Sequence, residues 1–431
     1  MHKRSKWMYG AWAVLTLVSV ALFGCSSGEL ASLLGGGGGA ATTRLLVVDY
    51  GNSRTMLYNL PITTNAPAIV AFGQPDLNSG ACATSATTQC SPNDSTMDPS
   101  GNVWVADYGN CRILKYAPPF TTGMAASVAI GQPDMTSSGC GVGPSSLDSP
   151  ANVAFDRNGN MFVLDWENNR VLEFQPPFTT GMSASVVLGQ VDLNSSACTT
   201  TANGLCDPWQ GIAIDANGNL WVGDRGNCRA VRYSPPFTTN MAATLVMGQP
   251  DFTSSNCGTS ATLNDGLSGV AVDPSGNLWA VDAANNRVLK FAAPLSNGMA
   301  ATVVIGQPDF TSSGSGTTAS TMRSVYDVAF DSSGNLYIAE SGNNRVTLFA
   351  PPFATGMSAT KVLGQPDLTS SGSGTSSGVR ARRRNPSPAA AGEGTLSPQS
   401  PEEWEVSHNQ SRLCPYIGFS KRLSHTPSLN P

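Results

Sequence analysis

The sequence predicts an all-β fold, a β-propeller of six four-stranded antiparallel blades. The first observation is a repeat: Gly-Gln-Pro-Asp, with Val for Pro in one copy, occurs six times at intervals of 58 or 59 residues. A fixed period of this size indicates a repeat architecture. The second observation is that each copy holds four short apolar or alternating runs separated by turn residues, the pattern of antiparallel strands.

The fifth repeat shows the predicted elements in order. Its innermost strand is expected at 269–273, and the turn Pro-Ser-Gly-Asn leads to a second strand at 278–282. An Asn-Asn turn precedes the third strand at 287–291, and a Pro-rich loop precedes the outermost strand at 301–305. A linker rich in Ser, Thr and Gly then leads to the next copy. When about 15 residues of linker are subtracted from the period, the remaining residues make a blade of ordinary propeller size.

The repeated residues carry a family resemblance. The run Val-Ala-Val-Asp, Gly-Asn-Leu-Trp-Ala-Val-Asp and Asn-Asn-Arg-Val resembles the NHL repeat, whose members form six-bladed β-propellers. Turns of the form Asp-x-x-Asn-x-Arg begin at Asp49, Asp107, Asp165, Asp224 and Asp282, and Glu340 replaces Asp in the sixth. The resemblance covers residues 44–378. It implies a fold and no single activity, because NHL-like propellers include scaffolds, carbohydrate or protein binders, and a few metal-dependent enzymes.

The closure of the ring departs from the repeat. The first blade begins at Leu45 with its second strand, and the expected inner strand does not recur after the sixth repeat, where the sequence turns to Arg380–Arg384. The sequence therefore predicts that the closing strand of blade one is missing. Residues 379–431 are rich in Pro, Ser and Arg and are predicted to be disordered. The basic cluster is interpreted as a solvated charge run, with contact to an anionic surface as the alternative.

The amino-terminal residues predict export and lipid anchoring. Residues 1–24 combine a basic start with an apolar segment too short to span a bilayer, as in a signal peptide. The segment ends in Leu-Phe-Gly-Cys and resembles a bacterial lipobox, which implies a lipid on Cys25. A signal peptidase I substrate or a hydrophobic anchor is the alternative. Residues 25–43 are predicted to be a Gly-rich tether. Ser26 favours the outer membrane or cell surface if the cell is Gram-negative.

The cysteines predict four disulfides. A Cys follows the Gly-Gln-x-Asp aspartate by six residues in linkers one to four. Linkers one and three hold a second Cys eight residues later, whereas the blades before linkers two and four hold one in the turn between their second and third strands. That turn and the linker leave a blade on the same face. The predicted pairs are Cys82 with Cys90, Cys111 with Cys140, Cys198 with Cys206, and Cys228 with Cys257.

Composition narrows the classes of function. Only 12% of residues are charged, and the net charge is -5 with no basic stripe in the repeats, which argues against nucleic-acid binding. His2, His408 and His425 are the only histidines, and all lie outside the repeats. A propeller enzyme with a histidine base or zinc ligand is therefore not expected, and no catalytic residue is assigned.

Positions that differ between blades are the candidates for function. Directly after the turn acid the first four blades have Tyr50, Tyr108, Trp166 and Arg225, which are predicted to lie on one face. Aromatic and Arg side chains are common anchors of binding surfaces. The alternative is that these are isolated exposed side chains. The aromatic residues of the second strand, in contrast, recur in five blades and are interpreted as blade-to-blade packing.

A second candidate lies at the start of the innermost strands. Asp94, Asn152 and Asp327 would line the central channel, where oxygen ligands could hold a Ca²⁺ ion. This arrangement resembles gluconolactonase-like propellers. The preferred hypothesis is an exported, lipid-anchored propeller acting as a non-catalytic binding or scaffolding module for a protein or carbohydrate, without a cofactor. The alternative is a metal-dependent hydrolase or lyase with a cation at the channel rim.

Overall fold

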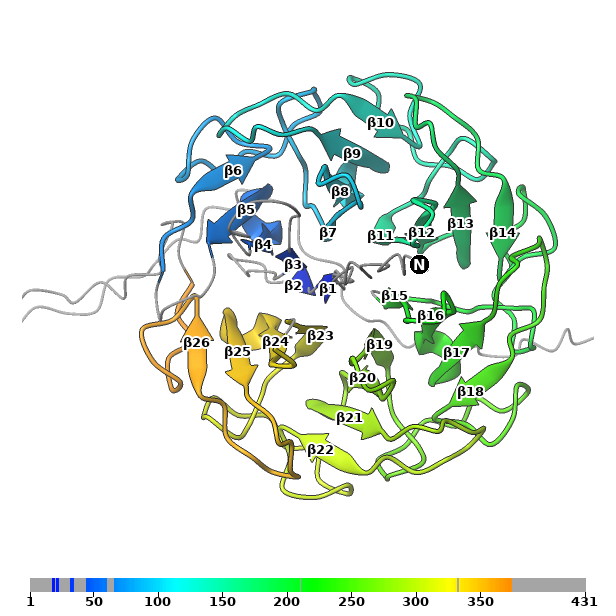
Figure 1. The fold of residues 1–431 in the computed structure, drawn as a ribbon, viewed down its shortest axis with the longest axis vertical. Helices are drawn as coiled ribbons and strands as arrows, with labels where there is room; N and C mark the ends of the chain where they lie inside the picture. The colour runs from blue at the N-terminus through cyan, green and yellow to red at the C-terminus, as the bar shows by residue number, and fades with distance from the viewer. Residues whose placement is uncertain are drawn as a thin grey trace, which may run out of the picture. The chain divides into compact units, whose positions relative to one another are not determined.

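The computed structural model describes residues 18–19, 21–22, 32–34, 44–59, 66–209, 211–331 and 333–373. This part of the chain forms six antiparallel sheets arranged as the blades of a ring around a central axis (Figure 1). Within the described residues there is no α-helix, and no helix is long and apolar enough to cross a membrane. The all-β, six-bladed prediction is confirmed.

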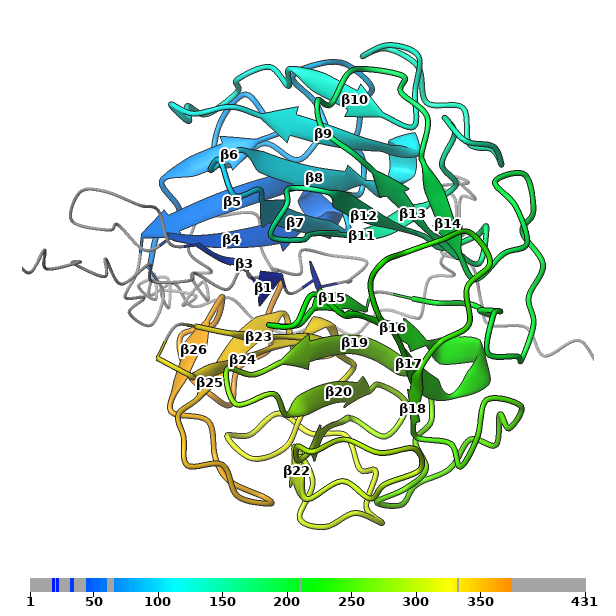
Figure 2. The same cartoon turned by 45° about the vertical axis from the view of Figure 1, so that its right-hand side comes forward.

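Blades two to six each have four strands, ordered from the ring centre outward. Figure 2 shows the strands of each blade side by side from the centre of the ring to its rim. The strands are β7 (Asp94–Met97), β8 (Val103–Asp107), β9 (Arg112–Tyr116) and β10 (Val128–Ile130) in blade two; β11 (Pro150–Phe155), β12 (Met161–Asp165), β13 (Arg170–Phe174) and β14 (Val186–Leu188) in blade three; β15 (Ile212–Ile214), β16 (Leu220–Asp224), β17 (Arg229–Tyr233) and β18 (Leu245–Met247) in blade four; β19 (Leu267–Val272), β20 (Leu278–Asp282), β21 (Arg287–Phe291) and β22 (Val303–Ile305) in blade five; and β23 (Val325–Phe330), β24 (Leu336–Glu340), β25 (Arg345–Phe349) and β26 (Lys361–Leu363) in blade six.

The first blade differs at its inner edge. Its outer three strands are β4 (Arg44–Asp49), β5 (Arg54–Asn59) and β6 (Val70–Phe72). The inner edge of β4 pairs antiparallel with β3 (Ser32–Leu34) and parallel with β2 (Ala21–Leu22), and β3 also pairs with β1 (Val18–Ser19). The prediction of a missing inner strand is therefore corrected. An unpaired β4 would leave a row of backbone donors and acceptors open, and residues preceding it in the chain satisfy them.

The turn between the second and third strands is built on a buried ion pair. In every blade the turn acid and the following Arg are at most 1% exposed. Arg112 donates to Asp107 Oδ2 at 2.7 Å, to the Met135 carbonyl at 2.7 Å, and to the Ser85 carbonyl at 3.0 Å. These carbonyls belong to the linkers before and after blade two. The guanidinium therefore ties both linkers to the turn, which explains why the motif recurs. Four of these turns are 3₁₀ helices: η1 (Tyr50–Asn52), η2 (Tyr108–Asn110), η3 (Arg225–Asn227) and η4 (Ser341–Asn343).

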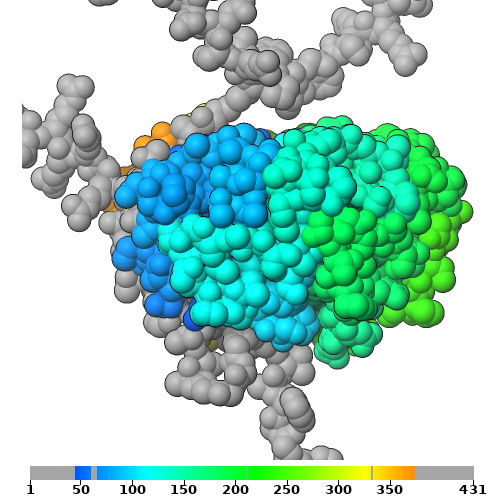
Figure 3. All heavy atoms as spheres, turned by 90° about the horizontal axis from the view of Figure 1, so that it is seen from above, coloured from blue at the N-terminus to red at the C-terminus, as the bar shows by residue number. Residues whose placement is uncertain are grey.

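Neighbouring blades pack through the aromatic residue of the second strand. Trp104 of β8 is fully buried and contacts Phe155 and Phe178 of blade three, with ring centroids 5.6 and 4.9 Å away. In blade five, Trp279 contacts Phe330 and Phe353 of blade six in the same way. The interpretation of this position as packing is confirmed. Viewed from above, the blue, cyan and green blades form a closely packed layer (Figure 3).

The loop between the third and fourth strands covers the outer edge of the preceding blade. The Thr180 hydroxyl accepts a hydrogen bond from Ala129 N at 3.2 Å, and Gly181 N donates to Ala129 O at 3.1 Å. Because β10 is an outermost strand, its backbone groups would otherwise be open to another chain. The repeated Thr-Gly of this loop therefore joins blades and closes an edge.

Four disulfides hold the linkers. They join Cys82 to Cys90, Cys111 to Cys140, Cys198 to Cys206, and Cys228 to Cys257, the same pairs as those expected from the spacing. No free cysteine occurs among the described residues. Disulfides persist in oxidising compartments, so these four indicate an extracellular or exported protein. Cys25, the tail at 379–431 and the cluster Arg380–Arg384 lie outside the described residues.

Candidate functional site

The four predicted binding residues lie at equivalent turns of adjacent blades. Tyr50 and Tyr108 are the first residues of η1 and η2, Trp166 follows β12, and Arg225 is the first residue of η3. Each is half-buried, in contrast to the acid that precedes it. The fold fixes these positions because the buried acid orients each turn. The next side chain therefore points away from the core on the linker face of the ring.

The side chains form a continuous row, which we call the aromatic belt: Tyr50, Tyr108, Trp166, Trp209 and Arg225. The rings of Tyr50 and Tyr108 lie 6.3 Å apart, and those of Tyr108 and Trp166 are stacked at 5.9 Å. Trp166 stacks on Trp209 with centroids 4.5 Å apart, and the Arg225 guanidinium lies 4.5 Å from the centre of the Trp209 ring. The structure thus brings all four predicted residues into one cluster.

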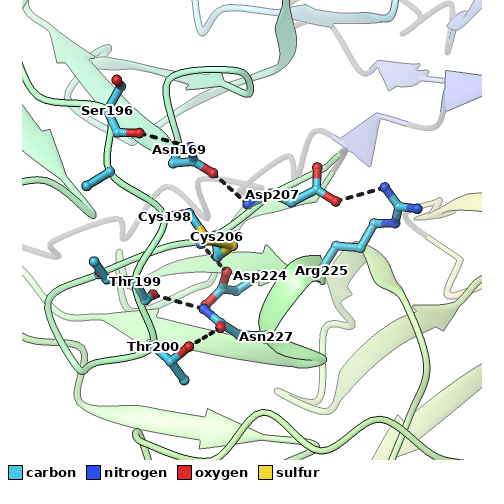
Figure 4. The surroundings of a disulfide bond; sticks show 12 residues. Asn169, Ser196, Cys198, Thr199, Thr200, Cys206, Asp207, Asp224, Arg225 and Asn227 are labelled. Carbon is cyan, nitrogen blue, oxygen red and sulfur yellow. Dashed lines mark hydrogen bonds and ion pairs between the residues drawn. A yellow bond between two sulfur atoms is a disulfide. The ribbon is translucent and has the colours of Figure 1, made fainter. Parts of the chain in front are cut away.

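A carboxylate fixes the polar end of the belt. Asp207 forms an ion pair with Arg225 at 3.0 Å and accepts a hydrogen bond from Trp166 Nε1. Figure 4 shows Asp207 between Asn169, which accepts a hydrogen bond from the Asp207 backbone N–H, and the Arg225 guanidinium. The Asp207 and Arg225 side chains are 39% and 29% exposed, so solvent screens this pair and its contribution to stability is small. Its main effect is to hold Arg225 over Trp209.

Burial also changes the acid–base properties of the belt. It raises the pKa of Tyr108 to about 12, and a hydrogen bond with Ser149 partly offsets this effect. Burial also raises the pKa of Tyr50 above its usual value. A hydrogen bond with Ser91 lowers it, but by less than burial raises it. Both phenols are therefore protonated at neutral pH. They offer hydroxyl groups and ring edges rather than charge.

Sequence reasoning did not identify three residues at this site: Trp209, Asp207 and Tyr326. Trp209 and Asp207 lie in the linker before β15, and Tyr326 lies in β23 with its ring centroid 6.3 Å from that of Trp209. None of them directly follows a turn acid. The other four residues were identified by comparing that one position between blades, so the same comparison could not identify these three. A Trp close to an inner strand was the available signal.

The predicted channel residues are buried in the inner strands. Asp94 is fully buried, and its Oδ2 accepts a hydrogen bond from Val153 N of the next blade at 2.9 Å. Asn152 is 3% exposed. Asp327 is 2% exposed, and its Oδ1 accepts from Val328 N at 2.8 Å. Burial raises the pKa of Asp327 well above its usual value, and the Asp94 charge raises it further.

A tight contact beside Asp327 explains one glycine. A Cβ on Gly269 of blade five would lie 2.3 Å from Asp327 Oδ1, so only glycine fits there. Groups of three or more possible metal ligands in the described ranges are Cys111, Cys140 and Asp148, and Cys228, Cys257 and Asp265. Their cysteines are in disulfides. Neither group includes the channel residues.

A family comparison identifies the repeat. The NHL repeat model matches residues 90–116, which span β7 to β9 of blade two. Blade two therefore contains an NHL repeat, within a six-bladed β-propeller. The match covers one blade, and the other blades repeat its turn acid, Arg and strand pattern.

Solved structures similar to this propeller include two lyases. Virginiamycin B lyase from Staphylococcus aureus has 14% identity and a TM-score of 0.43, with 78% of this chain and 86% of that chain covered. A streptogramin B lyase has 12% identity and a TM-score of 0.41, covering 78% and 85%. A putative gluconolactonase has 15% identity and a TM-score of 0.40, covering 69% and 81%. No curated protein matches the chain. At these identities and scores no activity is transferred.

Proposed function

We propose that the protein is an exported, non-catalytic binding or scaffolding module whose ligand binds at the aromatic belt. The observation that carries this proposal is the stack of Tyr108, Trp166, Trp209 and Arg225 on one face. The residues that recur in all blades serve turns, linkers and packing. The belt uses positions where the blades differ, and the repeat does not require an aromatic side chain there.

The chemistry of the belt suits a protein or carbohydrate ligand. Tyr, Trp and Arg are enriched at binding hot spots because they combine large apolar area with polar groups. The faces of Trp166 and Trp209 are stacked on one another, so a ligand meets ring edges, phenol hydroxyls and the Asp207–Arg225 pair. Such a row is rigid before binding, which lowers the entropy cost of association.

The direction of β3 supports an orientation toward the membrane. Ser32 pairs with Leu46 and Leu34 with Arg44, so the chain enters β3 from the end of β4 that leads to Tyr50. If Cys25 carries a lipid, Ser32 follows it by seven positions in the chain. An extended chain of that length spans about 24 Å. We propose that the belt face lies close to the membrane and that its ligand is a component of the cell envelope.

The proposal is tested by binding to separated envelope fractions. The full-length protein, solubilised in mild detergent, is passed over isolated envelope polysaccharide and, separately, over immobilised envelope proteins. We expect retention by one fraction, and we expect Trp209→Ala to weaken it at least tenfold because the central ring of the stack is lost. Trp221→Phe, a buried packing change in the same blade, is the matched control. Equal retention of wild type and Trp209→Ala would contradict the proposal.

A second candidate function is a metal-dependent hydrolase or lyase with Ca²⁺ at the channel rim. One observation favours it: Asp327 Oδ2 is buried and forms no hydrogen bond within the described part of the chain. An unsatisfied buried carboxylate oxygen is costly unless a cation or proton compensates it. Calorimetric Ca²⁺ binding that is lost in the double variant Asp94→Asn, Asp327→Asn would favour this candidate. Absence of Ca²⁺ binding would leave the non-catalytic module.

A further inference from the structure

A polar groove lies between blades three and four, on the face of the ring opposite the aromatic belt. Its volume is about 550 Å³. The walls come from the β11–β12 turn, including Asp156, from the β15–β16 turn, including Asn217, and from Pro235 and Phe237 of the next blade. Glu173 of β13 also lines it. The groove is therefore framed by two turns and one loop, and it lies outside the site described above.

The position of Glu173 is occupied by other residue types in the other blades. Between blades one and two, a groove of about 470 Å³ is lined by Leu57, which occupies the place of Glu173, together with Pro118 and Phe120. The Pro-Phe pair of the following blade thus lines both grooves. At this third-strand position the groove between blades one and two has an apolar side chain and takes its charge from Arg44 instead, whereas the groove between blades three and four has a carboxylate.

In three blades this residue is a cation placed over its cross-strand Trp. Lys115 pairs with Trp104 across β9 and β8, and its Nζ lies 5.3 Å from the ring centre. Lys290 lies 5.4 Å from the Trp279 ring in blade five, and Arg232 pairs with Trp221 in blade four at 5.8 Å. A cation over an aromatic face is a stabilising arrangement.

Blade three reverses the charge. Glu173 pairs across the strands with Phe162, so neither the cation nor the Trp is present. Phe162 packs edge-on against Phe237, which lines the groove, with centroids 5.0 Å apart. Blade three thus keeps aromatic rings at this position, but it has a carboxylate where three other blades have an ammonium or guanidinium group.

The Glu173 carboxylate is poorly compensated. It is 5% exposed, and its hydrogen bond from Gln175 Nε2 is long at 3.4 Å. No ion pair to it occurs within the described residues. Burial raises the pKa of Glu173, and nearby Asp156, a second carboxylate, raises it further by its like charge rather than compensating it. The carboxylate therefore lines the groove without a cationic partner among the described residues.

We propose that the groove between blades three and four binds an alkylammonium group through Glu173. The ligand ammonium would form an ion pair with the carboxylate and lie beside the Phe237 ring, much as the Lys115 ammonium lies over the Trp104 ring in blade two. The alkylammonium group belongs either to a free amine or to a lysine side chain of a partner. The protein's own Arg157, which is exposed and also lines the groove, is the competing cation.

The test is calorimetric titration of the full-length protein in mild detergent with two probes, 1,5-diaminopentane and Nα-acetyl-lysine methylamide. We expect binding of at least one probe and at least a tenfold loss in Glu173→Gln. In Glu173→Lys, which gives blade three the residue of blades two and five, we expect no binding. Lys115→Gln, the same position in another groove, is the matched control and should bind as wild type does. Far-ultraviolet circular dichroism and thermal melting establish that each variant is folded.

The outcomes separate the possibilities. Preference for the diamine indicates a free amine, and preference for the lysine derivative indicates a peptide ligand; both support the proposal. Absence of binding by folded wild-type protein at millimolar probe overturns it. Equal binding by Glu173→Gln also overturns it. Binding that occurs only in Arg157→Gln shows that Arg157 occupies the groove, and this likewise overturns it.

Discussion

Replacement of Arg170 by Met should be among the most damaging single changes in the propeller. Arg170 is fully buried and donates to Asp165 Oδ2 at 2.7 Å. It also donates to the Leu193 carbonyl at 2.6 Å and the Gly143 carbonyl at 3.0 Å, which lie in the linkers on either side of blade three. Met fills similar space and makes none of these bonds. Asp165 would remain as a buried charge without its ion-pair partner.

The magnitude follows from this geometry. Removing one partner of a buried ion pair costs about 3–5 kcal/mol, mainly because the other charge stays buried. The double variant Asp165→Asn, Arg170→Met removes that charge and should recover about half of the loss. Arg157→Met, at an exposed position in the same blade, should cost less than about 0.5 kcal/mol.

The assay is equilibrium unfolding of the full-length protein in guanidinium chloride, followed by Trp fluorescence and circular dichroism. Coincidence of the two transitions is required before a free energy of unfolding is derived. A loss below about 1 kcal/mol for Arg170→Met would refute the reasoning that these guanidiniums hold the linkers. A double variant less stable than Arg170→Met would also refute it, because the penalty would not arise from the unpaired carboxylate.

Three further predictions concern disulfides, pH and blade edges. Replacing Cys228 and Cys257 by Ser opens a loop of 29 residues and should lower the free energy of unfolding by about 3.6 kcal/mol. Replacing Cys198 and Cys206 by Ser opens a loop of eight residues and should lower it by about 2.5 kcal/mol. Thermal unfolding of the two double variants compares these losses, and a larger loss for the shorter loop would contradict the estimate. Burial raises the pKa of Asp165 to about 6, so the folded state binds this proton more tightly than the unfolded state, and the contribution of Asp165 to stability should rise as the pH falls from 7 toward 4. In Asp165→Asn, the free energy of unfolding should no longer show this rise between pH 7 and pH 4. A pH profile identical to that of the wild type would exclude the raised pKa of Asp165. Thr180→Val removes the hydrogen bond with Ala129 N and should cost about 1 kcal/mol while increasing hydrogen exchange in β10; unchanged exchange there would show that this bond does not protect the edge.

Most of the architecture was readable from the sequence because it repeats. The turn acid, the Arg five residues later and the aromatic residue of the second strand each occupy a fixed place in the period. Their roles are local or involve the next copy, so one blade predicts the others. The cysteines follow the same period. Where a linker holds only one Cys of a pair, the preceding blade holds the second Cys in the turn between its second and third strands.

The inner strand of blade one and part of the site could not be predicted in this way. β3 consists of Ser-Leu-Leu, which shows no alternation of apolar and polar residues and has no counterpart in another repeat. Trp209 meets Trp166 across a blade boundary, and Tyr326 reaches Trp209 from blade six. Such contacts depend on the ring geometry that brings distant segments together, and no local pattern records them.

The channel residues illustrate a different limit. Asp94 was identified as a possible ligand by residue type and position, and the structure gives its Oδ2 a hydrogen bond to the Val153 backbone of the next blade. A carboxylate at a strand start can therefore join blades as well as bind a cation. Glu173 was overlooked for a different reason. It is one of two charged residues in β13, and its distinguishing feature, Phe162 rather than Trp as its cross-strand partner, is visible only in the sheet register.

The most direct test of the central claim is in-cell photocrosslinking from the belt. Trp166 is replaced by a photoreactive phenylalanine analogue, and Arg157 on the opposite face is replaced in the same way as the control. The account predicts a discrete crosslinked species from position 166 that is lost when Trp209→Ala is added and is not obtained from position 157. Identical products from both positions, or a product that persists in Trp209→Ala, would contradict the assignment of the belt as the ligand site.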